Sequence, residues 1–231
     1  MAQREDASKM QSLFSQLMKY AKPLPREASP YLEPEDSPFS PPPGRWGISS
    51  YELKVARTLL EPIELEARGE GYKEIASLVC LPSFKPEWAV WVAGERKTGF
   101  SILLTEAEQN NWYSTLTAEM QFSVAPVRMY QSQLPTDRAG AICDIWKRIL
   151  AQTRYHPKSA LGCDGVNYHF AYWAVGSLPL AGKTWSPEET TVPGKLADLG
   201  QTLRDYVKDT ANQDVFLKAM EDHLEWFQSH S

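Results

Sequence analysis

The chain has 231 residues, of which 42% are hydrophobic and 23% charged, and its formal net charge is −5. That length and hydrophobic content suit a globular protein with a sizeable core. An acidic chain without a basic stripe is a poor nucleic-acid binder, and no run reaches the ~18 apolar residues of a membrane span. The polar N-terminus leads into no apolar signal region. We therefore expect a soluble, cytoplasmic protein that binds neither nucleic acid nor membrane.

The three cysteines, Cys80, Cys143 and Cys163, lie far apart and form no Cys-x-x-Cys pair. An odd number at such spacings does not indicate a disulfide framework. A reducing compartment fits this usage best.

The N-terminal part predicts one helix followed by an extended arm. Apolar residues from Met10 to Met18 recur at helical spacing. Eight of the 17 prolines then fall within residues 23–43, and such a tract cannot build a core. We assign residues 1–44 to this helix and arm. The arm is either a linker, a ligand for a proline-binding module, or a grip on a second subunit.

Residues 46–127 read mostly as strands. Residues 75–81 are rich in β-favouring side chains, and the apolar runs 88–93 and 100–104 flank a polar loop that begins and ends with glycine, which predicts a hairpin. Met120, Phe122 and Val124 alternate with polar residues, as in a half-buried strand.

Helical periodicity dominates the later part. Thr136 is a candidate N-cap for a helix whose apolar face includes Ile142, Trp146 and Ile149, and which we expect to end near residue 155. Two more amphipathic helices follow, around residues 196–207 and 215–227. The order predicts an α+β fold for residues 45–231, with an antiparallel sheet and helices packed on one face.

The most distinctive segment runs from Gly162 to Pro187. Asp164-Gly165 is a strong turn signal, and alternate side chains of the strand that follows would point to opposite sheet faces. We interpret this segment as structural, with the turn shaping the chain and the rings filling the core. The residues assigned to this motif are Asp164, Gly165, Tyr168, Phe170, Trp185 and Pro187.

Three catalytic or ligand-binding interpretations compete with the structural one. Gly182-Lys183-Thr184 imitates the end of a phosphate loop, but the upstream spacing is wrong and no helix can begin at Trp-Ser-Pro. His156, Cys163, Asp164 and His169 are metal-ligand types at spacings that fit no known metal motif, so we expect neither a metal nor another cofactor. Asp164, His169 and Cys163 remain the candidate catalytic residues if the protein is an enzyme.

The paired carboxylates make no better case for catalysis. A general acid needs burial to raise its pKa, and these pairs lie in polar surroundings, where we expect solvated side chains. His223 falls on the apolar stripe of the last helix and is expected to be a core or edge histidine. The pairs are Glu106/Glu108, Glu188/Glu189 and Glu221/Asp222.

The segments 162–170, 181–187 and 193–206 together resemble a group of uncharacterised bacterial proteins. These carry an Asp-Gly-x-x-Tyr-x-Phe strand, a Gly-x-x-Trp-Ser-Pro strand and a leucine-rich helix, and the similarity covers roughly residues 139–207. The resemblance marks a fold and implies no chemistry. Some similar proteins look like immunity or accessory partners encoded beside secreted bacterial toxins.

Together these observations predict a non-catalytic protein that binds another protein, immunity-like or otherwise an accessory partner of a bacterial toxin. Acidic surface and exposed aromatic residues would steer and anchor that partner. One alternative is a hydrolase or other enzyme that uses the three candidate residues above. Another is a structural protein that forms homo-oligomers through residues 1–44.

Overall fold

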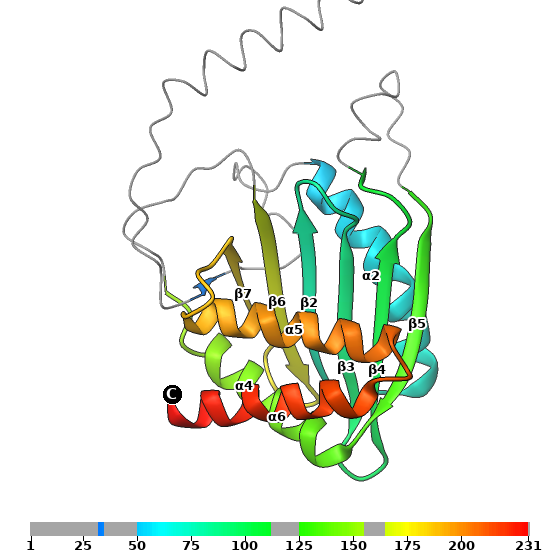
Figure 1. Ribbon diagram of the computed structural model, residues 1–231. Coiled ribbons are helices and arrows are strands. Elements are labelled where there is room, and N and C mark those ends of the chain that lie inside the picture. The colour runs from blue at the N-terminus through cyan, green and yellow to red at the C-terminus, as the bar shows by residue number, and fades with distance from the viewer. Residues whose placement is uncertain (1–31, 35–49, 112–124, 155–164, 231) are drawn as a thin grey trace, which may run out of the picture.

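The computed structural model describes residues 32–34, 50–111, 125–154 and 165–230 (Figure 1). These residues form one antiparallel sheet and four helices. None of the four helices has the length and apolar character that crossing a bilayer requires. The elements are β1 (Glu33–Pro34), α2 (Ser50–Glu70), β2 (Glu74–Pro82), β3 (Trp88–Glu95), β4 (Gly99–Ala107), β5 (Val127–Leu134), α4 (Thr136–Leu150), β6 (Val166–Ala174), β7 (Leu180–Trp185), α5 (Val192–Lys208) and α6 (Gln213–Ser229).

The seven strands follow the order β1-β7-β6-β2-β3-β4-β5, and every neighbouring pair is antiparallel. The central strand β2 is buried along almost its whole length, since both sheet faces are covered there. The predicted hairpin is present as β3 and β4, and the predicted strand at residues 75–81 as β2. The α+β class with an antiparallel sheet is confirmed.

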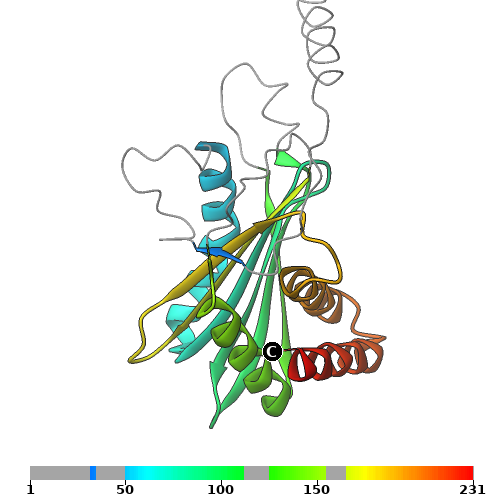
Figure 2. The ribbon, with the colours of Figure 1, turned by 90° about the vertical axis from the view of Figure 1, so that its left-hand side faces the viewer.

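Three helices, α4, α5 and α6, cover one face of the sheet (Figure 2). Alternate residues on neighbouring strands point into this layer, as the two-residue period of a strand requires. Trp146 of α4 lies at its centre and donates its indole N–H to the Ser77 carbonyl at 3.1 Å. The largest fully buried side chains from the strands in this core are Leu78, Phe100, Ile102, Leu104 and Phe170.

The fourth helix, α2, packs on the opposite face and was not expected. We predicted strands for most of residues 46–127, and that prediction is wrong for residues 50–70. Val55, Leu59 and Ile63 lie at helical spacing and pack against Val79 and Leu103. The burial of this apolar stripe stabilises α2 although Pro62 lies inside it, so tertiary packing outweighs the cost of an interior proline.

Other boundaries also differ from the predictions. Helix α4 begins at Thr136 itself, Pro135 is the N-cap, and no side chain caps the helix. It ends at Leu150 rather than near residue 155. Strand β5 was not predicted. The predicted helix at residues 10–18, the strand around Phe122 and most of the proline-rich arm lie outside the described residues.

A short piece of the arm belongs to the sheet. Glu33 and Pro34 of β1 pair with Lys183 and Gly182 of β7. Leu32, just before β1, is only 1% exposed and joins the main hydrophobic core. The division at residue 44 therefore separates the arm from the body in sequence, whereas in the structure part of the arm is packed onto the body.

Candidate functional site

The motif after Gly165 is a structural junction at one end of the sheet. Gly165 accepts a hydrogen bond from the Ser83 amide at 2.9 Å, and its own amide donates to the Ser83 hydroxyl at 3.1 Å. A side chain at Gly165 would collide with Ser186 and the Trp185 indole. Tyr168 and Phe170 stack with ring centroids 6.4 Å apart on the face that carries α4 and α5.

The structure describes one of the three candidate catalytic residues, His169. Asp164 and Cys163 lie outside the described residues. His169 is 6% exposed, sits between Val79 of β2 and Lys183 of β7 in register, and points to the sheet face that carries α2. The enzyme alternative therefore stays a prediction.

Two other thiols and one other imidazole in the described residues are shielded from solvent. Burial raises the pKa of Cys80 and of Cys143 well above the usual range of a thiol, so the reactive thiolate is disfavoured. His223 of α6 is half-buried against α5, with Nε2 3.3 Å from the Thr202 hydroxyl, and burial lowers its pKa. Within the described ranges no three His, Cys, Asp or Glu side chains gather as a metal site needs.

The segment that imitates a phosphate loop lies in β7. Gly182, Lys183 and Thr184 pair with Phe170, His169 and Tyr168 of β6 along a regular ladder. A phosphate loop needs a run of backbone amides at a helix N-terminus, and a strand interior does not provide one. The segment therefore has a structural place in the sheet.

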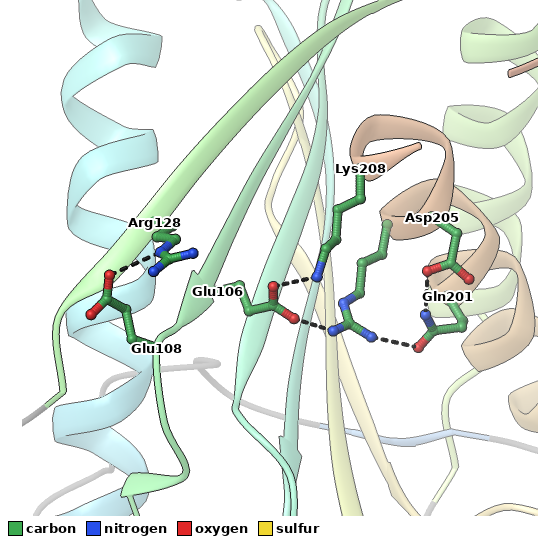
Figure 3. Close-up of polar contacts among 7 residues, drawn as sticks. Glu106, Glu108, Arg128, Gln201, Asp205 and Lys208 are labelled. Carbon is green, nitrogen blue, oxygen red and sulfur yellow. Dashed lines mark hydrogen bonds and ion pairs between the residues drawn. The ribbon is translucent and has the colours of Figure 1, made fainter. Parts of the chain in front are cut away.

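One carboxylate departs from the expectation of a solvated side chain. Glu106 of β4 is 13% exposed and forms ion pairs with Arg204 and Lys208 of α5, the latter at 2.6 Å (Figure 3). Arg204 also lies over the Trp88 ring, 5.3 Å from its centroid. We call Glu106, Arg204 and Lys208 the Glu106 cluster.

The Glu106 cluster keeps the carboxylate of Glu106 ionised, and an ionised carboxylate cannot donate a proton. Burial pushes the pKa of Glu106 upward, but hydrogen bonds from Lys208 and Arg204 outweigh it and hold the pKa below its ordinary value. A general acid near neutral pH needs the opposite shift. Glu108, its partner in the sequence pair, is exposed and pairs with Arg128 at 2.9 Å.

Three exposed apolar side chains lie close together in the sequence, at the end of β6 and in its connection to β7. Trp173, Val175 and Leu178 are 37%, 65% and 84% exposed. We call these three residues the tip patch. Gly176, with a φ of 84°, forms the turn between them, a backbone conformation that glycine adopts without strain.

A hollow of about 330 Å³, lined largely by charged residues, lies beside the tip patch. Residues from β6, from the start of β2 and from the β3–β4 turn line it, at the lower end of the sheet in Figure 1. The amide of Val175 donates to the Lys73 carbonyl at 2.9 Å, which ties the tip patch to this hollow. The lining residues are Lys73, Glu74, Glu95, Arg96, Lys97, Ala174 and Val175.

Arg96 organises the charges of this hollow. Its guanidinium donates to Asp144 at 2.6 Å and to Glu74 at 3.2 Å, and Glu74 also accepts the Tyr172 hydroxyl at 2.9 Å. Hydrogen bonds to Asp144 and Glu74 raise the pKa of Arg96, so its charge is permanent. We call Glu74, Arg96 and Asp144 the Arg96 cluster. The hollow thus combines fixed charges with an apolar neighbour, an arrangement suited to binding.

Sequence reasoning missed both clusters and the tip patch. The partners in the Arg96 cluster are 22 and 48 residues apart, and Glu106 is 98 residues from Arg204. A signal for the tip patch was present, since Trp173, Val175 and Leu178 flank a glycine turn.

Comparison with known proteins adds no family, because no family model, no curated protein and no solved structure matches the chain.

Proposed function

We propose that the protein is a non-catalytic binding protein, that its partner is another protein, and that the tip patch is its contact surface. One observation carries this proposal. Three of the seven exposed large hydrophobic side chains in the described residues fall within positions 173–178. The other four, Leu65, Phe84, Met129 and Val215, lie on four separate parts of the fold. Apolar side chains gathered at the surface beside polar groups are typical of interfaces.

The neighbouring hollow supports a binding surface rather than a reaction centre. Lys73 pairs with Glu95 at 3.0 Å, and Arg96 holds Glu74 and Asp144, so these charges are already compensated. Charges that already have a counter-ion keep their positions, and their desolvation costs less free energy when a partner displaces water. The net charge of −5 favours the approach of a partner with a basic surface.

The specific form that we propose is an immunity-like or accessory partner of a bacterial toxin. This form rests on the resemblance of residues 139–207 to bacterial proteins of that kind and on the acidic balance of the chain. The contact surface and the toxin are separate parts of the proposal, and one experiment can test both.

The test compares three tagged full-length chains in the source bacterium, followed by chemical cross-linking and mass spectrometry. The chains are the wild type, Leu178→Asp in the tip patch and Val215→Asp on α6. Val215 is a matched control, because it is 63% exposed and lies far from the tip patch in the chain. We expect a partner that Leu178→Asp loses and Val215→Asp keeps.

Two outcomes would contradict the proposal. If all three chains capture the same proteins in the same amounts, the tip patch is not the contact surface. If the Leu178-dependent partner is not a toxin, protein binding stands and the toxin form is wrong.

A further inference from the structure

The two outer edges of the sheet differ in what lies beside them. At one edge β1 pairs with β7, so the chain places a piece of its own arm there. At the other edge β5 pairs with β4 on its inner side, and none of the described strands pairs with its outer side (Figure 1). An unpaired edge offers a row of backbone donors and acceptors to an extended chain.

Two hydrogen bonds show which backbone groups of β5 face outward. The Glu108 amide donates to the Pro126 carbonyl at 2.9 Å, just beyond the last register pair of β4 and β5. In an antiparallel ladder this makes the even-numbered residues of β5 bond to β4 and turns the groups of the odd-numbered residues outward. The Gln133 carbonyl fits this alternation, since it accepts the Tyr206 hydroxyl of α5 at 2.8 Å.

Three residues of β5 keep outward groups that are open to pairing. Within the described part of the chain, no hydrogen bond reaches the outward groups of Val127, Met129 and Gln131. Met129 is 38% exposed and the side chain of Arg128 is 66% exposed, so this stretch of β5 is in contact with solvent in the folded chain. The next outward carbonyl, that of Gln133, is already occupied. The open stretch is therefore centred on Met129.

Strand β5 lacks the features that protect an exposed edge strand. Its eight residues pair with β4 in one unbroken register, without a bulge. It contains neither proline nor lysine, and its one charged residue, Arg128, is paired with Glu108 at 2.9 Å. Natural proteins use such features to stop edges from associating. Their absence from β5 indicates an edge that is paired in the native assembly.

We propose that β5 pairs with β5 of a second copy of the chain, antiparallel and about a two-fold axis at Met129. Met129 then lies opposite Met129 of the second copy, and Val127 lies opposite Gln131 of the second copy. All three open residues exchange main-chain hydrogen bonds, and the two sheets continue into each other.

Symmetry and charge both favour a second copy in this register. The open stretch is symmetric about Met129, so an identical strand running the other way pairs with all of it. An axis at Arg128 would place the two arginines opposite each other, and like charges in that position are destabilising. An axis at Tyr130 would use the Gln133 carbonyl, which Tyr206 occupies. The axis at Met129 instead places Arg128 opposite Tyr130 of the second copy.

The dimer leaves the tip patch available. Trp173 lies on β6, and β2, β3 and β4 separate β6 from β5 in the sheet. Dimerisation therefore does not depend on the proposed function, since it uses a different surface. Each dimer carries two tip patches, and two linked contact surfaces raise the avidity for a partner that offers repeated sites.

The first test measures the mass of the full-length protein by size-exclusion chromatography with light scattering, over a series of protein concentrations. We expect wild-type dimers that dissociate on dilution. Met129→Pro removes an outward amide and leaves the bonds to β4 in place, so it should weaken the dimer about tenfold. Gln133→Pro is the matched control, because it places proline at an outward position of β5 beyond the open stretch, and it should leave the dimer unchanged.

A charge-swap experiment tests the position of the axis. Met129→Lys and Met129→Glu each place two like charges opposite each other, so each variant alone should dimerise about tenfold more weakly than wild type. An equal mixture of the two should form heterodimers. Both side chains suit a position that is 38% exposed, and circular dichroism checks that each variant is folded. A dimer that survives in Met129→Lys, or variants that stay monomeric when mixed, would overturn the proposal.

Hydrogen exchange shows directly whether the edge is open. In dilute protein the Met129 and Gln131 amides should exchange fast, and they should become protected at concentrations that favour the dimer. The Tyr130 amide, which bonds to β4, should be protected under both conditions. If the Met129 amide is protected in the monomer, the chain covers its own edge and the proposal is wrong. Wild-type protein that is monomeric at every concentration would also reject it.

Discussion

Two ion-pair clusters tie the sheet to helices on the same face, yet they differ in what surrounds them. The Glu106 cluster joins β4 to α5, and its members are all at least half shielded, with Arg204 stacked on Trp88. The Arg96 cluster joins β2 and the β3–β4 turn to α4. Its Glu74 is as shielded as Glu106, but the Arg96 side chain is 51% exposed, against 22% for Arg204. Glu74 and Arg96 of the Arg96 cluster line the hollow beside the tip patch, whereas the Glu106 cluster holds α5 against β4.

The same ion-pair chemistry therefore serves two purposes, depending on how far the arginine is shielded from solvent. A shielded carboxylate with two cations has a large penalty if one partner is lost, so it stabilises one packing arrangement. An exposed arginine with two carboxylates contributes little to folding but holds a charged surface in a fixed shape. Stability should therefore depend on the Glu106 cluster, and binding on the surroundings of the Arg96 cluster.

The largest effect is expected from Arg204→Ala. This change leaves the shielded Glu106 with one cation and uncovers Trp88, and we expect a loss of about 3 kcal/mol in the free energy of unfolding. Urea denaturation measures it. Arg128→Ala is the matched control, since the Arg128–Glu108 pair is exposed and its loss should leave the free energy of unfolding almost unchanged. Equal losses in the two variants would remove the distinction between shielded and exposed pairs.

A smaller effect is expected from Arg96→Ala. Glu74 keeps the Tyr172 hydroxyl as a donor, and water reaches the vacated position, so the expected loss is about 1 kcal/mol. The same denaturation measurement applies. A loss as large as that of Arg204→Ala would show that the Arg96 cluster is a main support of the fold and would weaken its assignment to a binding surface.

The pH dependence of the free energy of unfolding gives a further test of the Glu106 cluster. The pKa of Glu106 is lower in the folded state than its ordinary value of 4.5, so the unfolded state binds more protons in acid. The stabilisation is fully present above that ordinary value and is lost as the pH falls through the lower folded-state pKa. The stability difference between wild type and Glu106→Gln should therefore shrink as the pH falls from above 4.5 through the lower folded-state pKa. A difference that stays constant over this range would contradict the assignment.

The smallest effect on stability is expected from Leu178→Ser and Val175→Ser. Both side chains are more than half exposed, so each change should alter the free energy of unfolding by less than about 0.5 kcal/mol. Thermal denaturation measures it. A large loss in either variant would mean that the tip patch supports the fold, and its exposure would no longer indicate binding.

Local patterns in the sequence were enough for much of the fold. The β-favouring composition of residues 75–81 and the paired runs 88–93 and 100–104 identified β2, β3 and β4, and the apolar stripes identified α4, α5 and α6. Helix α2 is not predicted from the sequence, because Pro62 and mixed signals nearby obscure the helical spacing of Val55, Leu59 and Ile63. Its stability comes from packing on the sheet, which no local window contains.

The candidate sites depended on contacts between distant parts of the chain. Glu106 looked solvated because its neighbours in sequence are polar, and only α5, about a hundred residues later, shields it. Leu32 looked like part of a linker because prolines surround it, and only β7 and the end of α4 give it a buried site.

The strands, the helices and hence the α+β class follow largely from local sequence periods, because those periods arise from backbone geometry within each segment. The assembled fold is what shields some charges and not others, leaves the apolar side chains of the tip patch exposed, and attaches the arm to the sheet. Burial is a property of the assembled chain, since each side chain is covered by residues that the sequence places far away.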